Sequence, residues 1–356
     1  MQALQKRKSP LNILAEAVFD PNAANFWLQK INPMWSVQQA LGQITQKETT
    51  ANGIVSLTLR CNRHFVMGQA GQHHPVFVEI KGRRYERTYS LTRIDAEHVM
   101  LTVKKVEQGL VSTWLVEQAQ VGDVIEFGQP YGDMQLPQQT QPLLLLAAGS
   151  GITPMLSLLT DLLEQDKAEQ TPVQLWYWVK THQDVAFKAR FEQMADQHPQ
   201  FQFKVFYTQD VEADQRLNAR HLEDLQQQLD QLTVYACGPS GFVSTAEQLF
   251  TGAAQFKGEA FSLTQLASDE TGFVNITLSK SNKTVAIPKG QSILVGLEQA
   301  NLNPEYGCRM GICHKCVCNK VQGATKNLVN GAQSTEPGDA LKLCVNAAQS
   351  DLVIDL

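Results

Sequence analysis

The sequence has no apolar run long enough to cross a bilayer. The longest, Leu143 to Ala148, falls far short of the roughly 20 residues that a membrane-spanning helix requires. The first residues, Met1 to Lys8, include basic side chains but are not followed by an apolar segment with a cleavage site. Positive charge is not in excess, because 30 Lys and Arg face 35 Asp and Glu, for a net charge of −5. We therefore expect a cytoplasmic protein without a nucleic-acid partner.

Cysteine is sparse and shows no disulfide pattern, with seven cysteines in 356 residues. The sequence also lacks a His and carboxylate cluster of the non-haem iron type. An enzyme built from this chain would therefore leave substrate oxidation by such an iron centre to a partner.

Four of the cysteines form one strong motif. Cys308, Cys313 and Cys316 have the C-x4-C-x2-C spacing of a plant-type [2Fe–2S] ferredoxin, and Cys344 supplies a distant fourth thiolate. A structural zinc site or disulfides are the alternatives, but zinc sites usually show paired C-x2-C knuckles and reducing cytosol disfavours disulfides. We predict a [2Fe–2S] cluster, and we expect Cys318 to be a small buried residue.

The composition, 43% hydrophobic and 18% charged, is that of a soluble globular protein. Patterning divides the chain into an N-terminal extension (1–36), an antiparallel β-barrel (37–137), an α/β domain with a parallel sheet (138–262), a polar linker (263–271) and a compact β-grasp ferredoxin domain (272–356). The barrel follows from short β-branched runs between Gly and Asn turns. The α/β domain follows from strands alternating with helices, such as a helix at Met155–Glu164 and another at Arg220–Leu229.

Two segments of the barrel carry ligand-binding patterns. Arg87-Thr-Tyr-Ser-Leu91 combines a permanent charge, an aromatic ring and a hydroxyl, and Gly109-Leu-Val-Ser-Thr113 opens a short helix. With these segments the sequence resembles the ferredoxin–NADP reductase superfamily, specifically its oxygenase-reductase branch with a fused ferredoxin, over roughly residues 40 to 356.

The resemblance implies a flavin site in the barrel. Arg87 would bind phosphate, Tyr89 would cover one face of the flavin, and the Ser90 hydroxyl would donate near flavin N5. The 109–113 segment would hold the pyrophosphate of FAD, so FAD is favoured over FMN. The predicted flavin-binding residues are Arg87, Thr88, Tyr89, Ser90, Gly109, Val111, Ser112 and Thr113.

The resemblance also implies a nicotinamide site in the α/β domain. Cys237 ends the last strand before Gly238-Pro239, and in the family this Cys lies against the nicotinamide; its alternative is a small buried residue. Ser90 and Cys237 are thus the predicted catalytic residues, and Glu259 is a weaker candidate at the flavin edge. The predicted nucleotide-binding residues are Gly149, Gly151, Thr153, Pro154, Gly238 and Pro239. Lys180 follows a strand, and no acidic residue stands directly after that strand to bind a ribose 2′-hydroxyl. This favours NADPH over NADH as the donor.

A flavin is the converter that links a two-electron nicotinamide to a one-electron cluster. We therefore predict an NAD(P)H-dependent flavin and iron–sulfur reductase that feeds a separate oxygenase. Asn32-Pro-Met-Trp35 and the loop Gly307–Cys313 are most similar to the reductase partners of bacterial membrane fatty acyl-CoA desaturases. The reductase of a soluble ring-hydroxylating or other multicomponent oxygenase, and a redox-sensing regulatory module, are the alternatives.

The N-terminal extension is not needed for any of these cofactors. Phe26, Trp27, Ile31 and Trp35 stand beside Lys30, as interfacial docking would require. Contact with the inner face of a membrane is therefore one expectation, and packing along the protein, even as a clamp between the flavin and ferredoxin domains, is the other. We expect a monomer.

Overall fold

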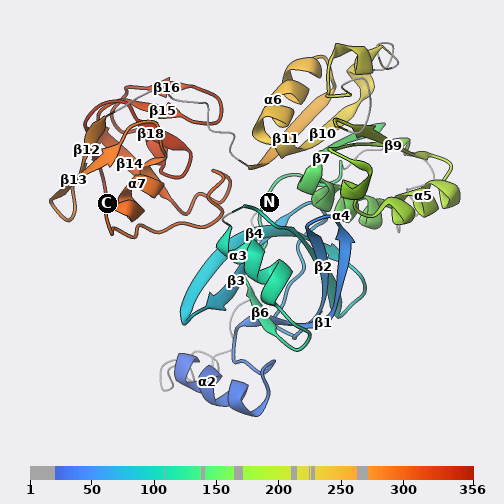
Figure 1. Cartoon of the computed structure of the whole chain (residues 1–356), viewed down its shortest axis with the longest axis horizontal. Coiled ribbons are helices and arrows are strands. Elements are labelled where there is room, and N and C mark those ends of the chain that lie inside the picture. Colours follow the sequence, from blue (N-terminus) through green and yellow to red (C-terminus); the bar gives the residue numbers. More distant parts are fainter. Residues whose placement is uncertain are drawn as a thin grey trace.

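A computed structural model describes residues 21–107, 109–137, 141–163, 171–209, 215–223, 225, 229–262 and 272–356. Figure 1 shows a central barrel, with the α/β domain to its upper right and the ferredoxin domain to its left. The predicted fold class is confirmed: an antiparallel barrel, a parallel-sheet domain and a β-grasp ferredoxin domain. The predicted linker at 263–271 lies outside the described residues.

The barrel closes in the strand order β1-β2-β5-β4-β3-β6. Its strands are β1 (Ala40–Ala51), β2 (Ile54–Cys61), β3 (His73–Ile80), β4 (Arg83–Arg93), β5 (His98–Lys104) and β6 (Val124–Phe127). A short helix, α3 (Leu110–Thr113), follows β5 and continues into a π turn. The β3–β4 register sets His73 opposite Ser90 and His74 opposite Tyr89. Pairing with β3 therefore decides what stands beside the predicted flavin motif.

The α/β domain is a parallel sheet in the order β11-β10-β7-β8-β9. Its elements are β7 (Leu143–Ala148), α4 (Ile152–Leu163), β8 (Val173–Val179), α5 (Lys188–Gln197), β9 (Phe201–Tyr207), β10 (Thr233–Pro239), α6 (Ser240–Leu249) and β11 (Gln255–Ser262). Every residue of β7 is buried, as expected of a central parallel strand covered on both faces.

One predicted helix of this domain differs in the structure. Where Arg220–Leu229 was expected, the described residues form two 3-10 turns, Ala219–Leu222 and Leu229–Gln231. The Asn218 side chain accepts a hydrogen bond from the Arg220 backbone N–H at 3.0 Å and caps the first turn. The polar run that follows has little apolar surface to dock a longer helix.

Helix α4 joins the barrel to the α/β sheet. Its Met155 and Leu158 are fully buried in one core cluster that also contains Met100 of the barrel and Leu145 of the sheet. A shared apolar core of this kind holds the two domains in a fixed relation.

The ferredoxin domain has a mixed sheet in the order β13-β12-β19-β14-β17 and a small sheet in the order β16-β15-β18. Its elements are β12 (Phe273–Leu278), β13 (Lys283–Pro288), α7 (Ile293–Gln299), β14 (Val317–Gln322), β15 (Thr325–Asn327), β16 (Gln333–Ser334), β17 (Ala340–Lys342), β18 (Asn346–Ala348) and β19 (Leu352–Ile354). Cys318 is buried in the core of this domain, which confirms its predicted structural role.

Helix α2 (Pro21–Ile31) lies at the end of the barrel away from the other two domains (Figure 1). Asn25 Oδ1 accepts hydrogen bonds from Ser36 Oγ at 3.1 Å and Val37 N at 2.8 Å, and Asn62 Nδ2 of the barrel donates to Gln39 O at 3.0 Å. Four apolar side chains in and after this helix, which we call the outer aromatic cluster, are exposed: Phe26 (54%), Trp27 (69%), Ile31 (73%) and Trp35 (50%). These side chains therefore do not clamp the flavin and ferredoxin domains together. No helix in the described part of the chain is both long and apolar enough to span a membrane.

Candidate active site at the meeting of three domains

A cavity of about 240 Å³ lies where the three domains meet, and we call it the three-domain cavity. The barrel contributes Arg87 to Ser90, the α/β domain contributes Ser150 and Thr153, and the ferredoxin domain contributes Cys308 and Met310. Its further lining residues are Thr102, Lys104, Val106, Gly109, Val111, Ser112 and Phe261. Segments far apart in the sequence thus line one cavity, which is open to solvent, beside a predicted cluster cysteine.

Most of the residues predicted to bind flavin line this cavity. Thr113 is the exception among them, and Thr153, predicted for the nucleotide, lines it as well. The Ser112 hydroxyl stabilises the loop, since it accepts from Val106 N at 3.1 Å and donates to Gly109 O at 3.2 Å. A Cβ on Gly109 would lie 2.5 Å from Ser112 Oγ, so this close approach needs glycine.

The wall of the cavity at Ser90 is backed by two buried polar side chains. Ser90 Oγ lies 3.0 Å from His73 Nδ1, and His73 Nε2 lies 2.6 Å from Glu259 Oε2. All three residues are at most 7% exposed. Sequence reasoning named Ser90 and Glu259 but missed His73, whose place depends on the β3–β4 register.

A second cavity, of about 400 Å³, lies at the carboxyl ends of the parallel strands, and we call it the nucleotide cleft. Gly149 and Pro239 line it, as do Lys180 and Arg216. The Asp184 carboxylate at its edge accepts hydrogen bonds from Thr181 N at 3.0 Å and Thr181 Oγ1 at 2.7 Å. Lys104 lines the cleft too, so three cationic side chains surround it together with one carboxylate that already accepts two hydrogen bonds.

Gly151 and Gly238 pack tightly around Cys237. A Cβ on Gly151 would lie 1.9 Å from the Cys237 carbonyl oxygen, and a Cβ on Gly238 would lie 2.8 Å from Ala148 Cβ. Cys237 itself is fully buried, and burial raises the pKa of its thiol well above the usual value. Cys237, Gly151, Gly238 and the buried helix residue Pro154 line neither cavity. Any access of a nicotinamide to Cys237 therefore requires movement, and the residue's role stays a prediction.

Lys104, at the end of β5, lines both cavities. Its Nζ lies 3.5 Å from where a Cβ on Gly149 would stand. A cation at this junction suits phosphate groups approaching from either side. Sequence reasoning missed it because a lysine at a strand end is ordinary.

The four predicted cluster cysteines form two pairs, and no three of them are close enough in the described part of the chain to form a ready metal-binding group. Cys308 N donates to Cys313 Sγ at 3.1 Å, and Cys316 Sγ lies 3.2 Å from Cys344 Sγ. Met310 N and Cys313 N each donate to Cys308 Sγ at 3.3 Å. Hydrogen bonds from the paired thiols lower the pKa of Cys313 to about 5 and that of Cys316 to about 7. Thiolate sulfurs that accept backbone N–H donors, as those of Cys308 and Cys313 do, are the ligand type of a [2Fe–2S] cluster.

An ion pair joins the cluster loop to the barrel. Lys315, between two cluster cysteines, donates to both carboxylate oxygens of Glu86 at 2.7 Å, and Glu86 precedes Arg87 of the flavin motif. Lys315 Nζ also lies 5.6 Å from the centre of the Phe77 ring. These contacts hold the cluster loop at the three-domain cavity.

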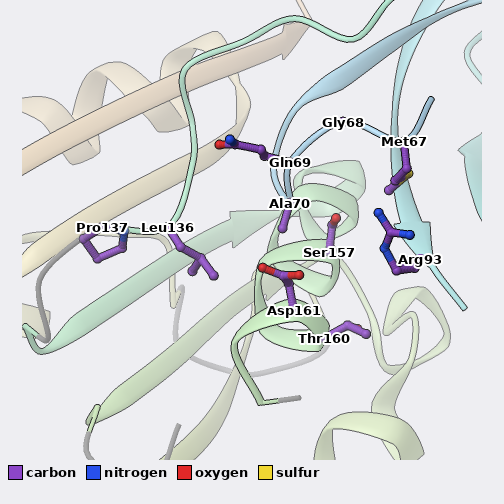
Figure 2. A pocket seen from close by; sticks show the side chains of 10 residues that line it. All are labelled: Met67, Gly68, Gln69, Ala70, Arg93, Leu136, Pro137, Ser157, Thr160 and Asp161. Carbon is purple, nitrogen blue, oxygen red and sulfur yellow. The ribbon is translucent and has the colours of Figure 1, made fainter. Parts of the chain in front are cut away.

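A third cavity, of about 450 Å³, lies beside α4 (Figure 2). Arg93 of the barrel and Ser157, Thr160 and Asp161 of α4 point toward it. Its lining includes none of the predicted site residues. The predicted flavin- and nucleotide-binding residues that line a cavity therefore line one of the other two.

Family models match the chain in three consecutive segments. Residues 42–136 match an oxidoreductase FAD-binding domain, residues 145–248 an oxidoreductase NAD-binding domain, and residues 276–347 a 2Fe-2S iron-sulfur cluster binding domain. These matches confirm the predicted cofactors: FAD, NAD(P)H and a [2Fe–2S] cluster.

Curated relatives match over most of the chain. An NADPH oxidoreductase of Mycobacterium tuberculosis is 30% identical and covers 97% of this chain, with 92% of its own length matched. Phthalate dioxygenase reductase of Burkholderia cepacia is 26% identical over 76% of this chain and 83% of its own length.

A solved structure has the same three-part architecture. Phthalate dioxygenase reductase, described as a modular structure for electron transfer from pyridine nucleotides to [2Fe-2S], superposes with a TM-score of 0.66 at 25% identity. The match covers 89% of this chain and 98% of that one.

Proposed function

The chain belongs to the ferredoxin–NADP reductase superfamily, in the branch that unites FAD-binding, NAD-binding and [2Fe–2S] domains, and we propose that this oxidoreductase supplies electrons to a membrane fatty acyl desaturase. Bound flavin would accept two electrons from NAD(P)H and release them singly. Arg87 and Lys104 would bind its phosphates, Ser90 would orient its ring, and the four cysteines would hold the cluster.

One observation carries the electron-transfer role. The three-domain cavity is lined by Ser90 of the flavin motif and by Cys308 of the cluster motif. The two redox centres would therefore be neighbours, without a separate carrier between them. Ser90→Ala and Cys237→Ala are expected to slow flavin reduction by NAD(P)H with flavin still bound, because each removes a positioning contact. Arg87→Ala is expected to lose flavin affinity instead. Stopped-flow absorbance and flavin content measure the two effects, and wild-type values in all three variants would contradict the site.

The choice of a membrane acceptor rests on α2. Its outer aromatic cluster is accompanied by Lys30 and by Arg60 and Arg63 of the adjoining barrel edge, all exposed. Exposed aromatic residues beside basic ones suit the interface of an anionic bilayer, where each Lys or Arg near the surface contributes about 1 kcal/mol. We propose that this end of the molecule rests on the membrane that holds the acceptor.

Vesicle flotation tests the membrane contact. Binding to vesicles with anionic phospholipid is expected, and Trp27→Ser with Ile31→Ser should weaken it by at least about tenfold, because two apolar side chains would no longer be buried. Phe273→Ser is the matched control, since Phe273 is 70% exposed but lies on the ferredoxin domain. Equal binding by all three proteins would refute the contact.

A soluble oxygenase is the second candidate, favoured by the name of the relative phthalate dioxygenase reductase. Coupled assays separate the two. A membrane acceptor predicts that the Trp27→Ser, Ile31→Ser protein reduces dyes normally but fails to drive desaturation on membranes. Full coupling to a purified ring-hydroxylating oxygenase, with none to a desaturase, would favour the soluble partner. Rapid repeated reduction of cytochrome c by NAD(P)H would exclude a purely redox-sensing module.

We propose NADPH as the preferred donor. In the nucleotide cleft Lys180 would pair with a 2′-phosphate, while the Asp184 carboxylate already accepts two hydrogen bonds from Thr181. The ratio of kcat/KM for NADPH and NADH measures the preference, and comparable values would contradict it.

We also propose that the domains are divided as the sequence predicts and that the protein is a monomer. Limited proteolysis is expected to cut first within 263–271 and to release the ferredoxin domain, 272–356, from the rest. Light scattering is expected to give the mass of one chain, 39.6 kDa. A dimer mass, or a first cut elsewhere, would revise this part.

A further inference from the structure

A fourth cavity, of about 450 Å³, lies between α2 and the barrel, and we call it the α2 cavity. One wall is the end of the helix and the turn after it, with Leu28, Met34 and Trp35. The other wall is the end of β2 and the turn after it, with Arg60 and Arg63. Its further lining residues are Asn32, Ser36, Cys61, Asn62 and His64. The volume lies within the range of about 300–1,000 Å³ that is usual for ligand sites.

The two walls are built from hydrogen-bonded turns. On the helix side, Trp35 N donates to Asn32 O at 2.9 Å. On the barrel side, His64 N donates to Asn62 Oδ1 at 3.1 Å. His64 Nε2 lies 3.0 Å from Ser36 O and donates to it, since a carbonyl oxygen only accepts. This last bond joins the two walls, so the cavity is part of the fold.

The polar side of the α2 cavity carries positive charge. Arg60 and Arg63 are exposed, and neither forms an ion pair with any residue that the structure describes. The described residues that line the cavity include no Asp or Glu. A guanidinium group binds phosphate oxygens through two parallel N–H donors. The two arginines therefore suit a phosphate group.

The apolar side distinguishes a phospholipid from a free phosphate. Leu28 and Met34 are half-buried, and Trp35 belongs both to the lining of the cavity and to the outer aromatic cluster. The glycerol and first acyl carbons of a lipid would gain from contact with such a wall, whereas a free phosphate would not. Tryptophan rings are also common at the headgroup level of bilayers. These observations favour a lipid.

We propose that the α2 cavity binds the phosphate of one anionic phospholipid, with Arg60 and Arg63 pairing with the phosphate and Trp35 contacting the glycerol end. The inference rests on the proposed membrane contact and deepens it, because it names the lipid and its site. A headgroup held between helix and barrel would fix how the barrel is oriented on the membrane.

Titration of the intact holoprotein with dihexanoyl phosphatidylglycerol, kept below the concentration at which it forms micelles, tests the cavity without a bilayer. Calorimetry should show saturable binding, weakened at least about tenfold in the Arg60→Gln, Arg63→Gln protein, because two charge-assisted contacts are lost. The control removes the same charge from the other two domains, by Arg220→Gln and Lys283→Gln at exposed positions. Dye reduction by NADPH should be unchanged in all of these proteins, which shows that they are folded.

Inorganic phosphate identifies the source of the phosphate group. It should bind at least about tenfold more weakly than the lipid, and Trp35→Ala should weaken lipid binding but not phosphate binding, because only the lipid uses the apolar wall. Equal affinity for lipid and inorganic phosphate would overturn the lipid assignment. Absence of lipid binding, or wild-type affinity in the Arg60→Gln, Arg63→Gln protein, would overturn the site.

Vesicle flotation of the same proteins separates this inference from the proposed function. If wild type binds anionic vesicles, and the Arg60→Gln, Arg63→Gln protein binds both vesicles and soluble lipid equally well, the inference alone fails. If wild type does not bind the vesicles, the proposed membrane contact fails, and the titration with soluble lipid still decides whether the cavity is a lipid site.

Discussion

The two ends of the barrel differ in how they are built. At the end with the three-domain cavity, Ser90 and His73 are buried and each polar atom has a partner on another strand or domain. At the other end, α2 exposes Trp27 and Ile31 at 69% and 73% and contacts the barrel through a few amide hydrogen bonds. The arrangement of side chains at the cavity end depends on how strands and domains pair, whereas the other end depends only on the exposed surface of one helix. Substitutions at the cavity end should therefore affect catalysis, and substitutions at the α2 end should affect binding of the protein to the membrane.

The largest effect is expected at the cavity end, in the cluster. Cys313→Ser removes one of four thiolates and should abolish the [2Fe–2S] absorbance and cytochrome reduction, while NAD(P)H still reduces the flavin, because the flavin is held by a different domain core. Visible spectra and stopped-flow absorbance measure both. Loss of flavin reduction as well would show that the domains do not act as separate modules.

A buried histidine of the barrel, His74, should make the free energy of unfolding depend on pH. Burial lowers the pKa of His74 from 6.5 to about 4, so the unfolded chain binds a proton that the folded chain resists. Stability is therefore full above about pH 6.5 and falls by up to about 3 kcal/mol as the pH drops toward 4.

His74→Gln should remove most of this pH dependence. The glutamine oxygen can still accept the hydrogen bond that Gly68 N gives to His74 Nε2 at 3.1 Å. Urea unfolding between pH 4 and 7 measures the effect, with His98→Gln as an exposed control. Identical pH profiles for wild type and His74→Gln would contradict the prediction.

The ion pair at the cavity end should have a smaller effect. Lys315→Met keeps an apolar stem near Phe77 but loses the bond to Glu86, so transfer from flavin to cluster should slow roughly two- to fivefold, in keeping with about 1 kcal/mol or less for a partly exposed pair. The wild-type rate should also decrease with salt, and the variant rate should not. Lys283→Met, on an exposed strand of the same domain, is the control.

The smallest effect is expected on stability at the α2 end. Trp27→Ala should change the free energy of unfolding by no more than about 0.5 kcal/mol, because the side chain is 69% exposed. Urea unfolding measures this, and a loss of several kcal/mol would mean that the helix supports the fold.

The same contrast explains what could be predicted from the sequence. Cys308, Cys313 and Arg87 could be predicted because their motifs are contiguous or have fixed spacing, and the fold class followed from strand and helix periodicity. His73 and Lys104 were not found, because their roles arise only when the barrel register and the parallel sheet bring distant segments together. The burial of Cys237 was one of the two alternatives stated for it from the sequence, and the structure adds the close approach of Gly151 to its carbonyl oxygen.

The slender attachment of α2 has a consequence for engineering. The helix precedes β1 in the chain, and the described side-chain hydrogen bonds of the helix itself to the segment before β1 come from Asn25 and Gln29. A different targeting helix could therefore be grafted ahead of Ser36 without disturbing the redox centres at the opposite end. The reductase could then be directed to a different membrane or partner by exchanging this one segment.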